Sequence, residues 1–443
     1  MYVSERILIF AHKNQKKERN MKKLVMSLMM LLPLTVSAEE FEGYTIYEKV
    51  QIGEFFYNLL PAYQWAELTR KGKYSGDVVI PESVVYNDTV YTVRTFGRGA
   101  FRDCRELTSV TIPKSVVSID AEAFTGCIRL TSVTIPDNVI SLGSQVFQNC
   151  TNLTSVTIGS GVTSMGSGVF WDCDNLAEIT IPDNVTELGN SVFYGCNKLS
   201  SVTLGKGVKI ITHGCFSNCP SLTYIPYGEN ITEIESEAFQ FCESLVNIDI
   251  PSGVTKIGLA AFHGCKNLST VNIPEGVTTL GGSLFSNCIS LKSVVLPDDV
   301  TKLGTYVFSN CSSMTTAVIP NSVTVIGEGL FASCKSLKDV YCYANTVPES
   351  DGNDYEAFSD FSNVGNATLH VPAGSLDQYK TTEPWKRFGS IVALTDTDPS
   401  PTGITAAERT REANIQYYDL RGHKVHHPQK GLYIGNGRKV VIK

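Results

Sequence analysis

Apolar residues recur along this chain with a period of 23 residues between Phe101 and Cys334. In every period a phenylalanine stands three residues before a cysteine, and a leucine, once replaced by Met314, stands three residues after it. The cysteines of the series are Cys104, Cys127, Cys150, Cys173, Cys196, Cys219, Cys242, Cys265, Cys288, Cys311 and Cys334. Because ten successive intervals pass without an insertion or deletion, the pattern predicts like units stacked on one another.

Two more apolar positions alternate with polar ones, six and eight residues after each cysteine. Val110 and Ile112 form the first such pair, and Pro113 follows them directly. An apolar residue at every second position predicts a short β-strand with one buried face, and the proline ends the pairing because it has no N–H to donate. We therefore expect one short parallel strand per repeat, in a curved solenoid whose units fold only against their neighbours.

The repeat unit resembles that of a known family. Its pattern, Phe-x-x-Cys-x-x-Leu-x-x-Val-x-Ile-Pro-x-x-Val-x-x-Ile-Gly-x-x-Ala, is similar to the BspA-like bacterial surface leucine-rich repeat across residues 78–392. The resemblance implies a secreted or cell-surface protein of anaerobic bacteria, a binding scaffold that is often an adhesin, and no catalysis. The fold class we expect is an α/β repeat solenoid: a curved leucine-rich-repeat stack with a short parallel β-strand per repeat, plus a small C-terminal β-module.

The residues on either side of the repeats lack this register. Residues 39–77 show an alternation of aromatic and apolar side chains without the repeat register, which predicts an N-terminal β-rich cap on the repeats of residues 78–343. A small hairpin is expected at residues 86–91. Residues 344–394 are expected to form a degenerate repeat, in which Phe358 continues the phenylalanine series, and a C-terminal cap closed by Trp385. Within that cap, Ser375 is expected to be the N-cap of a short helix.

The N-terminus has the pattern of an export signal. Lys22 and Lys23 precede an apolar run from Leu24 to Val36, and small residues follow before Glu39. Residues 1–38 are therefore predicted to hold a signal peptide whose true start is Met21, because a signal peptide begins with its basic region. A membrane anchor is the alternative, but the run is short for a membrane span. We expect a mature protein without a membrane span, secreted or on the outer cell surface.

The C-terminal end is predicted to be separate from the solenoid. Residues 395–402, rich in Asp, Pro and Thr, indicate a linker. Residues 403–443 are expected to form a small β-module, because Asn436-Gly437 is a strong hairpin turn signal. This module resembles a short type IX secretion sorting domain through Tyr418-Asp419-Leu420-x-Gly422, Gly431-x-Tyr433 and its basic ending. A plain structural tail is the alternative.

The cysteine series predicts a ladder of buried thiols on one inner edge of the solenoid. Each thiol can bond backbone in the turn, and a disulfide would pull adjacent repeats out of equal spacing, so we expect mostly free thiols. Cys215 and Cys342 fall at other apolar positions of the repeat. A linear ladder does not converge on one point, as zinc ligands must, so no metal site is expected.

Other chemistry finds no support in the residue pattern. The net charge of −7 and the lack of a basic patch argue against nucleic acid as a partner. The seven histidines fall at different repeat positions or in the tails, so none is paired with a nucleophile or a ligand set. No glycine-rich phosphate loop follows a strand. We therefore expect no enzyme activity, no catalytic residues and no cofactor.

The positions five and seven residues after each cysteine should point outward from the strand. In the first five repeats they are almost all Ser or Thr, which is ordinary for an exposed strand but also suits an array of hydroxyls for glycans, or less favourably for ice. The sixth repeat interrupts this strip. Aromatic, amide and carboxylate groups on a rigid sheet suit sugar or peptide recognition. The candidate ligand-binding residues are Glu178, Tyr224, Asn247, Asp249 and Asn272.

These observations predict a secreted or cell-surface binding protein that recognises a host protein or glycan through its strand face. A non-adhesive structural or interbacterial envelope component has the same sequence features and stays open as the alternative. Adhesion itself is implied by the family resemblance alone.

Overall fold

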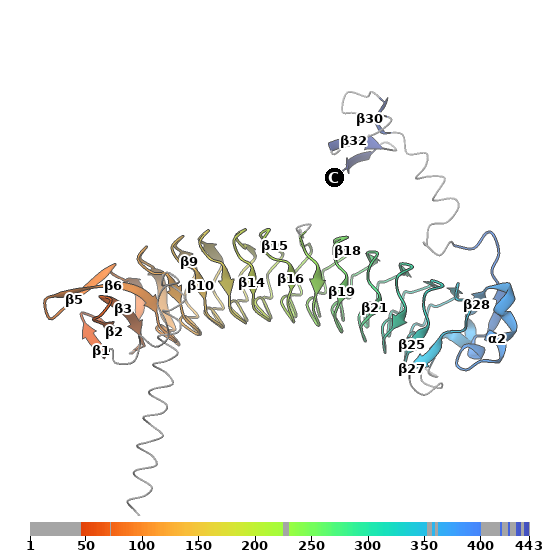
Figure 1. Cartoon of the computed structure of the whole chain (residues 1–443), viewed down its shortest axis with the longest axis horizontal. Coiled ribbons are helices and arrows are strands. Elements are labelled where there is room, and N and C mark those ends of the chain that lie inside the picture. The colour runs from red at the N-terminus through yellow and green to blue at the C-terminus, as the bar shows by residue number, and fades with distance from the viewer. Residues whose placement is uncertain are drawn as a thin grey trace, which may run out of the picture.

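The computed structural model describes residues 46–70, 72–224, 230–351, 357–358 and 362–399, and the backbone of four strands between residues 417 and 442. The predicted signal peptide and residues 403–416 lie outside the described residues. Figure 1 shows an elongated stack of strands that begins with a sheet at the N-terminal end and ends beside the helix α2 (Leu376–Thr381). The predicted solenoid of 23-residue repeats is therefore confirmed.

The strand that the alternating pattern predicts is present in nearly every repeat, and we call this series the long ladder. Its members are β7 (Glu106–Thr111), β9 (Ser132–Ile135), β11 (Ser155–Ile158), β13 (Glu178–Thr180), β15 (Ser201–Thr203), β18 (Asn247–Asp249), β20 (Thr270–Asn272), β22 (Ser293–Val295), β24 (Thr316–Ile319), β26 (Asp339–Cys342), β28 (Thr368–Val371) and β29 (Ser390–Ala393). Pairing is parallel, with Val133 beside Val156 and thus one repeat apart. The sixth repeat has only an isolated bridge from Ser201 to Tyr224.

Each repeat also contains a second strand, so the prediction of one strand per repeat was wrong. The short ladder consists of β8 (Ser118–Ile119), β10 (Ser141–Leu142), β12 (Ser164–Met165), β14 (Glu187–Leu188), β16 (Ile210–Ile211), β17 (Glu233–Ile234), β19 (Lys256–Ile257), β21 (Thr279–Leu280), β23 (Lys302–Leu303), β25 (Val325–Gly327) and β27 (Glu349–Asp351). Most of these strands have two residues, which is too short for a period-two pattern to be visible in the sequence.

The third segment of the repeat is a turn that holds the phenylalanine and the cysteine. Its backbone also bonds from repeat to repeat: Phe124 N donates to Val146 O at 2.8 Å. The residues five and one positions before each cysteine, such as Gln145 and Asn149, have φ near +60°. This left-handed conformation favours Gly, Asn and Asp, which are common there.

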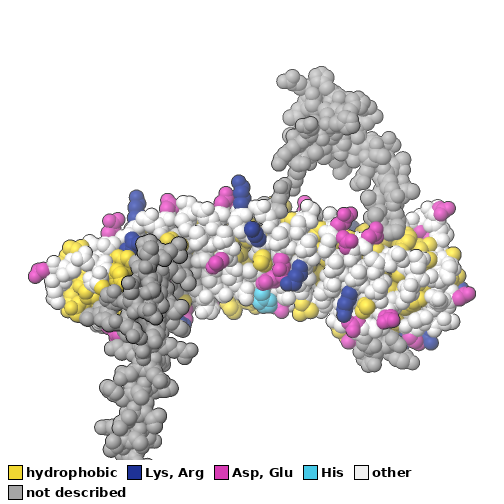
Figure 2. Space-filling model, in the orientation of Figure 1, with side chains coloured by type: hydrophobic (Ala, Val, Ile, Leu, Met, Phe, Trp, Pro, Cys, Tyr) yellow, Lys and Arg dark blue, Asp and Glu magenta, His cyan; other side chains and the backbone are white. Residues whose placement is uncertain are grey.

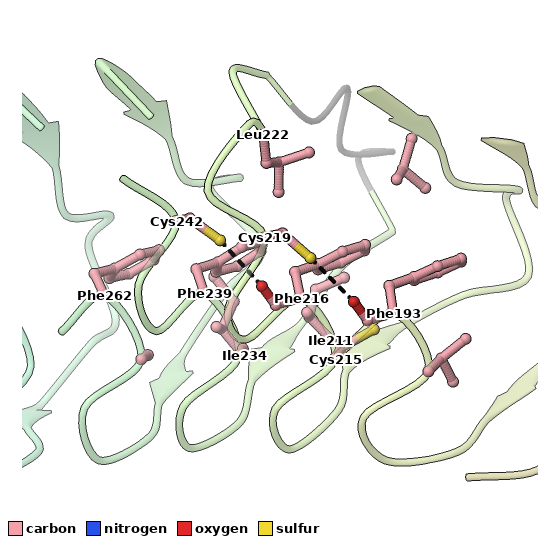
Figure 3. Close-up of a cluster of buried hydrophobic side chains, with 14 of the residues drawn as sticks. Phe193, Ile211, Cys215, Phe216, Cys219, Leu222, Ile234, Phe239, Cys242 and Phe262 are labelled. Carbon is pink, nitrogen blue, oxygen red and sulfur yellow. Dashed lines mark hydrogen bonds between the residues drawn. The ribbon is translucent and has the colours of Figure 1, made fainter. Parts of the chain in front are cut away.

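The core is a column of stacked rings lined by thiols. The rings of neighbouring phenylalanines are nearly parallel, and their centroid separations range from 5.0 Å between Phe101 and Phe124 to 6.2 Å between Phe331 and Phe358. Figure 3 shows four of these rings in a row, with the Cys219 and Cys242 thiols directed at the carbonyls of Phe193 and Phe216. Because each repeat presents the same side chain to the next, the rings stack face to face and exclude water.

A mixed sheet covers the first repeat. It contains β1 (Tyr47–Ile52), β2 (Phe55–Leu60), β3 (Trp65–Thr69) and the hairpin of β5 (Ser83–Tyr86) and β6 (Thr89–Phe96), and β6 continues into the short ladder. Among these five strands, β3 and β6 pair in parallel and the other neighbours are antiparallel. The strand β4 (Ser75–Val79) begins the long ladder beside β7. The predicted small hairpin turns at Asn87 and Asp88, which both have positive φ.

Aromatic residues close the other end. Phe358 stacks on Phe331, as predicted, and packs edge-on against Trp385 and Phe388. The helix α2 follows the 3₁₀ turn η3 (Ala373–Ser375), and the turns η2 (Val364–Asn366) and η4 (Trp385–Arg387) flank it. Ser375 is the residue before α2, but its hydroxyl donates to Asn345 O at 2.6 Å and makes no capping bond.

The C-terminal strands β30 (Tyr417–Tyr418), β31 (Lys424–Val425), β32 (Gly431–Gly435) and β33 (Arg438–Ile442) form an antiparallel sheet, and β32 and β33 pair across the predicted hairpin turn. Helix is scarce in the whole described structure, since α2 has only six residues. None of the helices there has the length and apolar character needed to cross a bilayer.

Candidate functional site

The outward side chains of the long ladder form a continuous surface, which we call the strand face. It consists of the residues five and seven positions after each repeat cysteine. Ser132 and Thr134 on β9 are exposed while Val133 between them is buried, which confirms the alternation. Ser155 lies beside Ser132, and Thr157 beside Thr134, because β9 and β11 pair without a register shift.

Hydroxyl groups next to the strand face are used within the protein. The residue four positions after the cysteine donates to the carbonyl of the same position one repeat earlier, as in Thr154 Oγ1 to Thr131 O at 3.1 Å and Ser200 Oγ to Ala177 O at 3.1 Å. These side chains link the repeats to each other. The sequence alone does not separate them from the neighbouring Ser and Thr of the strand face.

The hydroxyls of the strand face itself behave differently. Those of Ser132, Thr134, Ser155 and Thr157 make no hydrogen bond to any residue that the structure describes. At the N-terminal end of the face, Asp77 Oδ1 accepts hydrogen bonds from Ser109 Oγ at 2.7 Å and Thr108 Oγ1 at 2.8 Å. These two donors lower the pKa of Asp77. The face therefore begins with an ionised carboxylate and continues as a row of hydroxyls.

The structure brings three of the five predicted ligand-binding residues together. Asn247 and Asp249 lie on β18, and Asn272 on β20 is the direct neighbour of Asp249. All three are exposed. Asn247 Oδ1 accepts a hydrogen bond from Thr270 Oγ1 at 2.7 Å, so its amide is held in place on the face.

The other two candidates lie toward the N-terminal side of this group. Tyr224 is 56% exposed and pairs with Ser201 through the isolated bridge. Glu178 on β13 pairs with Ser201 from the other side, so one repeat, that of Ser201, lies between Glu178 and Tyr224. Residues 225–229, which follow Tyr224, lie outside the described residues. The five residues thus lie along one line rather than around one pocket.

The C-terminal end of the strand face carries a cluster that the sequence did not indicate. The His370 ring stacks on Tyr341 with centroids 4.3 Å apart, and His370 Nε2 is 3.1 Å from Asp339 Oδ1. His370 Nδ1 lies 3.8 Å from Asp398 Oδ2, and the Tyr343 hydroxyl donates to the carbonyl of Pro399. The first part of the expected linker therefore packs on the last strands. Aligning residues 368–371 with the repeat register could have placed His370 on this face.

Burial in the cluster raises the pKa of Tyr341, and the charges of Asp339 and Asp398 raise it further. The pKa of Tyr343 is raised by its burial and by Asp398. The cluster has a histidine between two carboxylates, and among the described residues no Ser, Thr or Cys side chain is hydrogen-bonded to the imidazole. It is suited to holding residues 395–399 against the solenoid.

The cysteine ladder is a structural feature. All thirteen cysteines are unpaired and buried, and each thiol from Cys127 to Cys334 in the repeat series donates to a phenylalanine carbonyl, as in Cys265 Sγ to Phe239 O at 3.2 Å. Burial raises the pKa of Cys150 and Cys334 to about 12. Because the reactive form of a thiol is the thiolate, these groups are poor nucleophiles and poor metal ligands.

Within the described ranges, no group of three or more His, Cys, Asp or Glu residues is placed to hold a metal ion. Figure 2 shows that basic and acidic side chains are interspersed on the visible face, with no large patch of either sign. The strand face can thus present hydroxyls, amides and single carboxylates to a ligand, which are recognition groups.

Comparison with known proteins places the repeats in a family. Residues 94–223 and 232–365 match the model described as the BspA type leucine rich repeat region. No curated protein matches the chain. Among solved structures, the chain is similar to a leucine-rich repeat protein from Bacteroides ovatus ATCC 8483, with 27% identity, a TM-score of 0.57, and coverage of 78% of this chain and 100% of that one.

The pneumococcal vaccine antigen PcpA is a second structural neighbour. It has 16% identity to this chain, a TM-score of 0.53, and coverage of 79% of this chain and 99% of that one. At this identity the likeness concerns the fold alone.

Proposed function

The chain belongs to the BspA-type leucine-rich repeat family, and on that premise we propose that it is a secreted or cell-surface binding protein that recognises a host protein or glycan through its strand face. The family is one of bacterial surface repeat proteins, and such solenoids are typically not enzymes. Beyond this family-level role, the proposal specifies the class of ligand, a host protein or glycan, and the surface that contacts it, the strand face.

One observation carries the proposal: on β9 and β11 the hydroxyls of the strand face have no partner within the described structure, whereas the hydroxyl of Thr154 beside them bonds the preceding repeat. Ser132, Thr134, Ser155 and Thr157 lie on rigid parallel strands, so few degrees of freedom are lost when a ligand binds them. A hydroxyl both donates and accepts, which matches the hydroxyls of a sugar or the amides of an extended peptide. Asn247, Asp249 and Asn272 would add amide and carboxylate groups further along the same face.

The experiment is binding of the purified chain to arrays of host glycans and extracellular-matrix proteins, in parallel with two strand-face variants. One variant changes Ser132, Thr134, Ser155 and Thr157 to Ala, and the other changes Tyr224, Asn247 and Asp249 to Ala. The matched control changes Ser141 and Ser164 to Ala, because these residues lie on the short ladder. Circular dichroism and thermal unfolding establish that all variants fold.

We expect saturable binding that the control keeps and at least one strand-face variant loses. Loss in the first variant would place the ligand on the hydroxyl row, and loss in the second would place it on the middle repeats. Absence of binding by the folded chain, or equal binding by all variants, would contradict the proposal and favour the structural or interbacterial envelope role.

Export forms part of the same proposal. The basic and apolar segment of residues 21–38 supports cleavage before Glu39, and the motifs between Tyr418 and Tyr433 support sorting by type IX secretion. Mass spectrometry of the mature protein should find Glu39 at its N-terminus. Deleting residues 403–443 should reduce the amount outside the cell without lowering the amount made. An intact N-terminus from Met21, or unchanged export of the shortened chain, would contradict these two parts separately.

A further inference from the structure

Two aromatic side chains stand out on the turn segment of the repeats, away from the strand face. The position two residues before the cysteine is small or polar in most repeats, as in Gln148, Ser217 and Gln240. Trp171 and Tyr194 occupy it in two successive repeats. Their ring centroids are 4.9 Å apart, their planes are tilted by 52°, and both side chains are partly exposed. Neither ring belongs to the buried phenylalanine column.

Two carboxylates accompany the rings. Asp172 and Asp174 flank the buried Cys173, and both are partly exposed. The Trp171 side chain acts to lower the pKa of Asp172, against the effect of burial. The Asp172 carboxylate lies across Gly195, where a Cβ atom would be 2.1 Å from Oδ1, so a larger residue there would displace the carboxylate. Asp174 Oδ1 accepts a hydrogen bond from Asn197 Nδ2 at 2.7 Å.

The charges of this pair are not compensated. Neither Asp172 nor Asp174 forms an ion pair with a Lys or Arg among the residues that the structure describes. Burial raises the pKa of Asp172, and the charge of Asp174 raises it further. A cation bound beside both carboxylates would relieve this repulsion, whereas a neutral ligand would not.

Aromatic rings and carboxylates attract the same kind of ligand. The face of a Trp or Tyr ring is electron-rich and binds a guanidinium or an ammonium group, and a carboxylate adds a charge-assisted hydrogen bond. We propose that Trp171, Tyr194, Asp172 and Asp174 form a recognition site for an arginine or lysine side chain of a basic segment in a partner protein. This site is on the turn segment and does not depend on the strand-face proposal.

The repeats supply a matched substitution for each residue of the site. Trp171→Gln installs the residue type found at the same repeat position as Gln148, and Tyr194→Ser the type of Ser217. Asp172→Asn and Asp174→Asn correspond in the same way to Asn149 and Asn197. Because these types already occur in folded repeats, each variant should fold. Glu187→Gln removes one charge from the short-ladder strand of the same repeat as Trp171 and is the control.

The probe is an acetylated and amidated peptide with three arginines separated by glycines, and a glutamine analogue is the neutral reference. The chain has three tryptophans, so 5-fluorotryptophan labelling gives three ¹⁹F signals, and Trp171→Gln identifies the one from the site. We expect the arginine peptide to shift the Trp171 signal and leave the other two unchanged, with an affinity that falls as salt is raised.

Fluorescence anisotropy of labelled peptide should show at least a tenfold weaker affinity for the Asp172→Asn/Asp174→Asn double variant, a similar loss for Trp171→Gln, and no change for Glu187→Gln.

Three results would overturn the proposal. The first is equal binding of the glutamine peptide, and the second is unchanged affinity in the double Asn variant. The third is a Trp171 signal that responds to neutral oligosaccharides and not to the arginine peptide, which would assign the rings to a glycan instead. Circular dichroism of each variant distinguishes loss of the site from loss of the fold.

Discussion

The two ends of the solenoid are closed by different means. At the C-terminal end, the polar groups of the two buried aromatic residues Trp385 and Tyr379 have partners: Trp385 Nε1 donates to Pro348 O at 3.0 Å, and the Tyr379 hydroxyl donates to Ala344 O at 2.8 Å. At the N-terminal end, the Tyr57 and Tyr74 hydroxyls are buried without a partner among the described residues, and the Glu67 carboxyl is buried beside Asn58.

This difference bears on where the stack loses stability first. A buried polar group with a partner contributes modestly to stability, whereas one without a partner costs its desolvation. Burial raises the pKa of Glu67 to about 8, and Asp120 adds to the shift, while the Asn58 amide opposes it. The N-terminal cap should therefore weaken as the pH rises, and the C-terminal cap should not share that dependence.

The largest effect is expected from Trp385→Ala. Trp385 is fully buried against Phe358, Tyr379 and Phe388. Removing it leaves a cavity and an unpaired carbonyl, which should cost about 3–5 kcal/mol in the free energy of unfolding. Urea denaturation followed by tyrosine fluorescence measures this. Lys386→Ala is the control and should cost less than about 1 kcal/mol; similar losses in the two variants would contradict the cap assignment.

The next effect is a gain in stability from Glu67→Gln. The folded state keeps a proton that the unfolded chain releases, so the contribution of wild-type Glu67 is fully present below pH 4.5 and is lost as the pH rises to about 8. The shift corresponds to at most roughly 5 kcal/mol, and we expect the variant to recover about 2–3 kcal/mol at pH 8.

Urea midpoints at pH 4.5 and pH 8 test this directly. The variant should be close to wild type at pH 4.5 and more stable at pH 8. A gain of equal size at both pH values would show that titration of Glu67 is not the cause. Glu106→Gln, an exposed carboxylate of β7, is the matched control.

Removing one tyrosine hydroxyl from each cap should change the free energy of unfolding in different directions. Tyr379→Phe removes a hydroxyl that bonds Ala344 O and Cys342 Sγ, and should cost about 1–2 kcal/mol. Tyr74→Phe removes a hydroxyl that has no partner among the described residues, and should be neutral or stabilise by up to about 1 kcal/mol. Thermal unfolding of both variants measures the two signs. If both substitutions lower the midpoint equally, the two caps do not differ in this respect.

The smallest effect is expected at the C-terminal end of the strand face. His370→Ala removes the ring between Asp339 and Asp398 and should release residues 395–399 at a cost of about 0.5–1 kcal/mol. Hydrogen–deuterium exchange should become faster in residues 395–399 and stay unchanged in β9 and β11. His213→Ala, at an exposed turn position, is the control. Unchanged exchange in residues 395–399 would show that His370 does not hold them.

Much of the fold could be predicted from particular residues. The spacing of Phe101 and Cys104 in successive repeats predicts the ring column and the thiol ladder, because the same side chain meets itself in the next repeat. The alternation of Val110 and Ile112 predicts the long ladder. The short ladder was missed, because two residues such as Ser141 and Leu142 show no period, and so was the hydroxyl bond of Ser375, whose acceptor is 30 residues away.

The candidate site could be predicted only in part. The outward direction of Ser132 and Asp249 follows from strand alternation, but a Ser or Thr at the preceding position, such as Thr154, looks the same in the sequence and is bonded in the structure. The Trp171 and Tyr194 pair and the His370 cluster depend on contacts between repeats. The sequence shows the residue types at those positions without showing that their partners are absent or present.

The sequence by itself determined the inner part of this protein: the period, the buried columns and the direction of the strands. It could do so because each repeat packs against a near copy of itself, so one unit contains the contacts of all. Only the tertiary structure decided which hydroxyls are free, how the two ends are closed, and where Asp398 and Asp174 lie. Those outcomes depend on non-repeating segments, or on which atoms 23 or more residues away come within hydrogen-bond distance, and no local pattern encodes them.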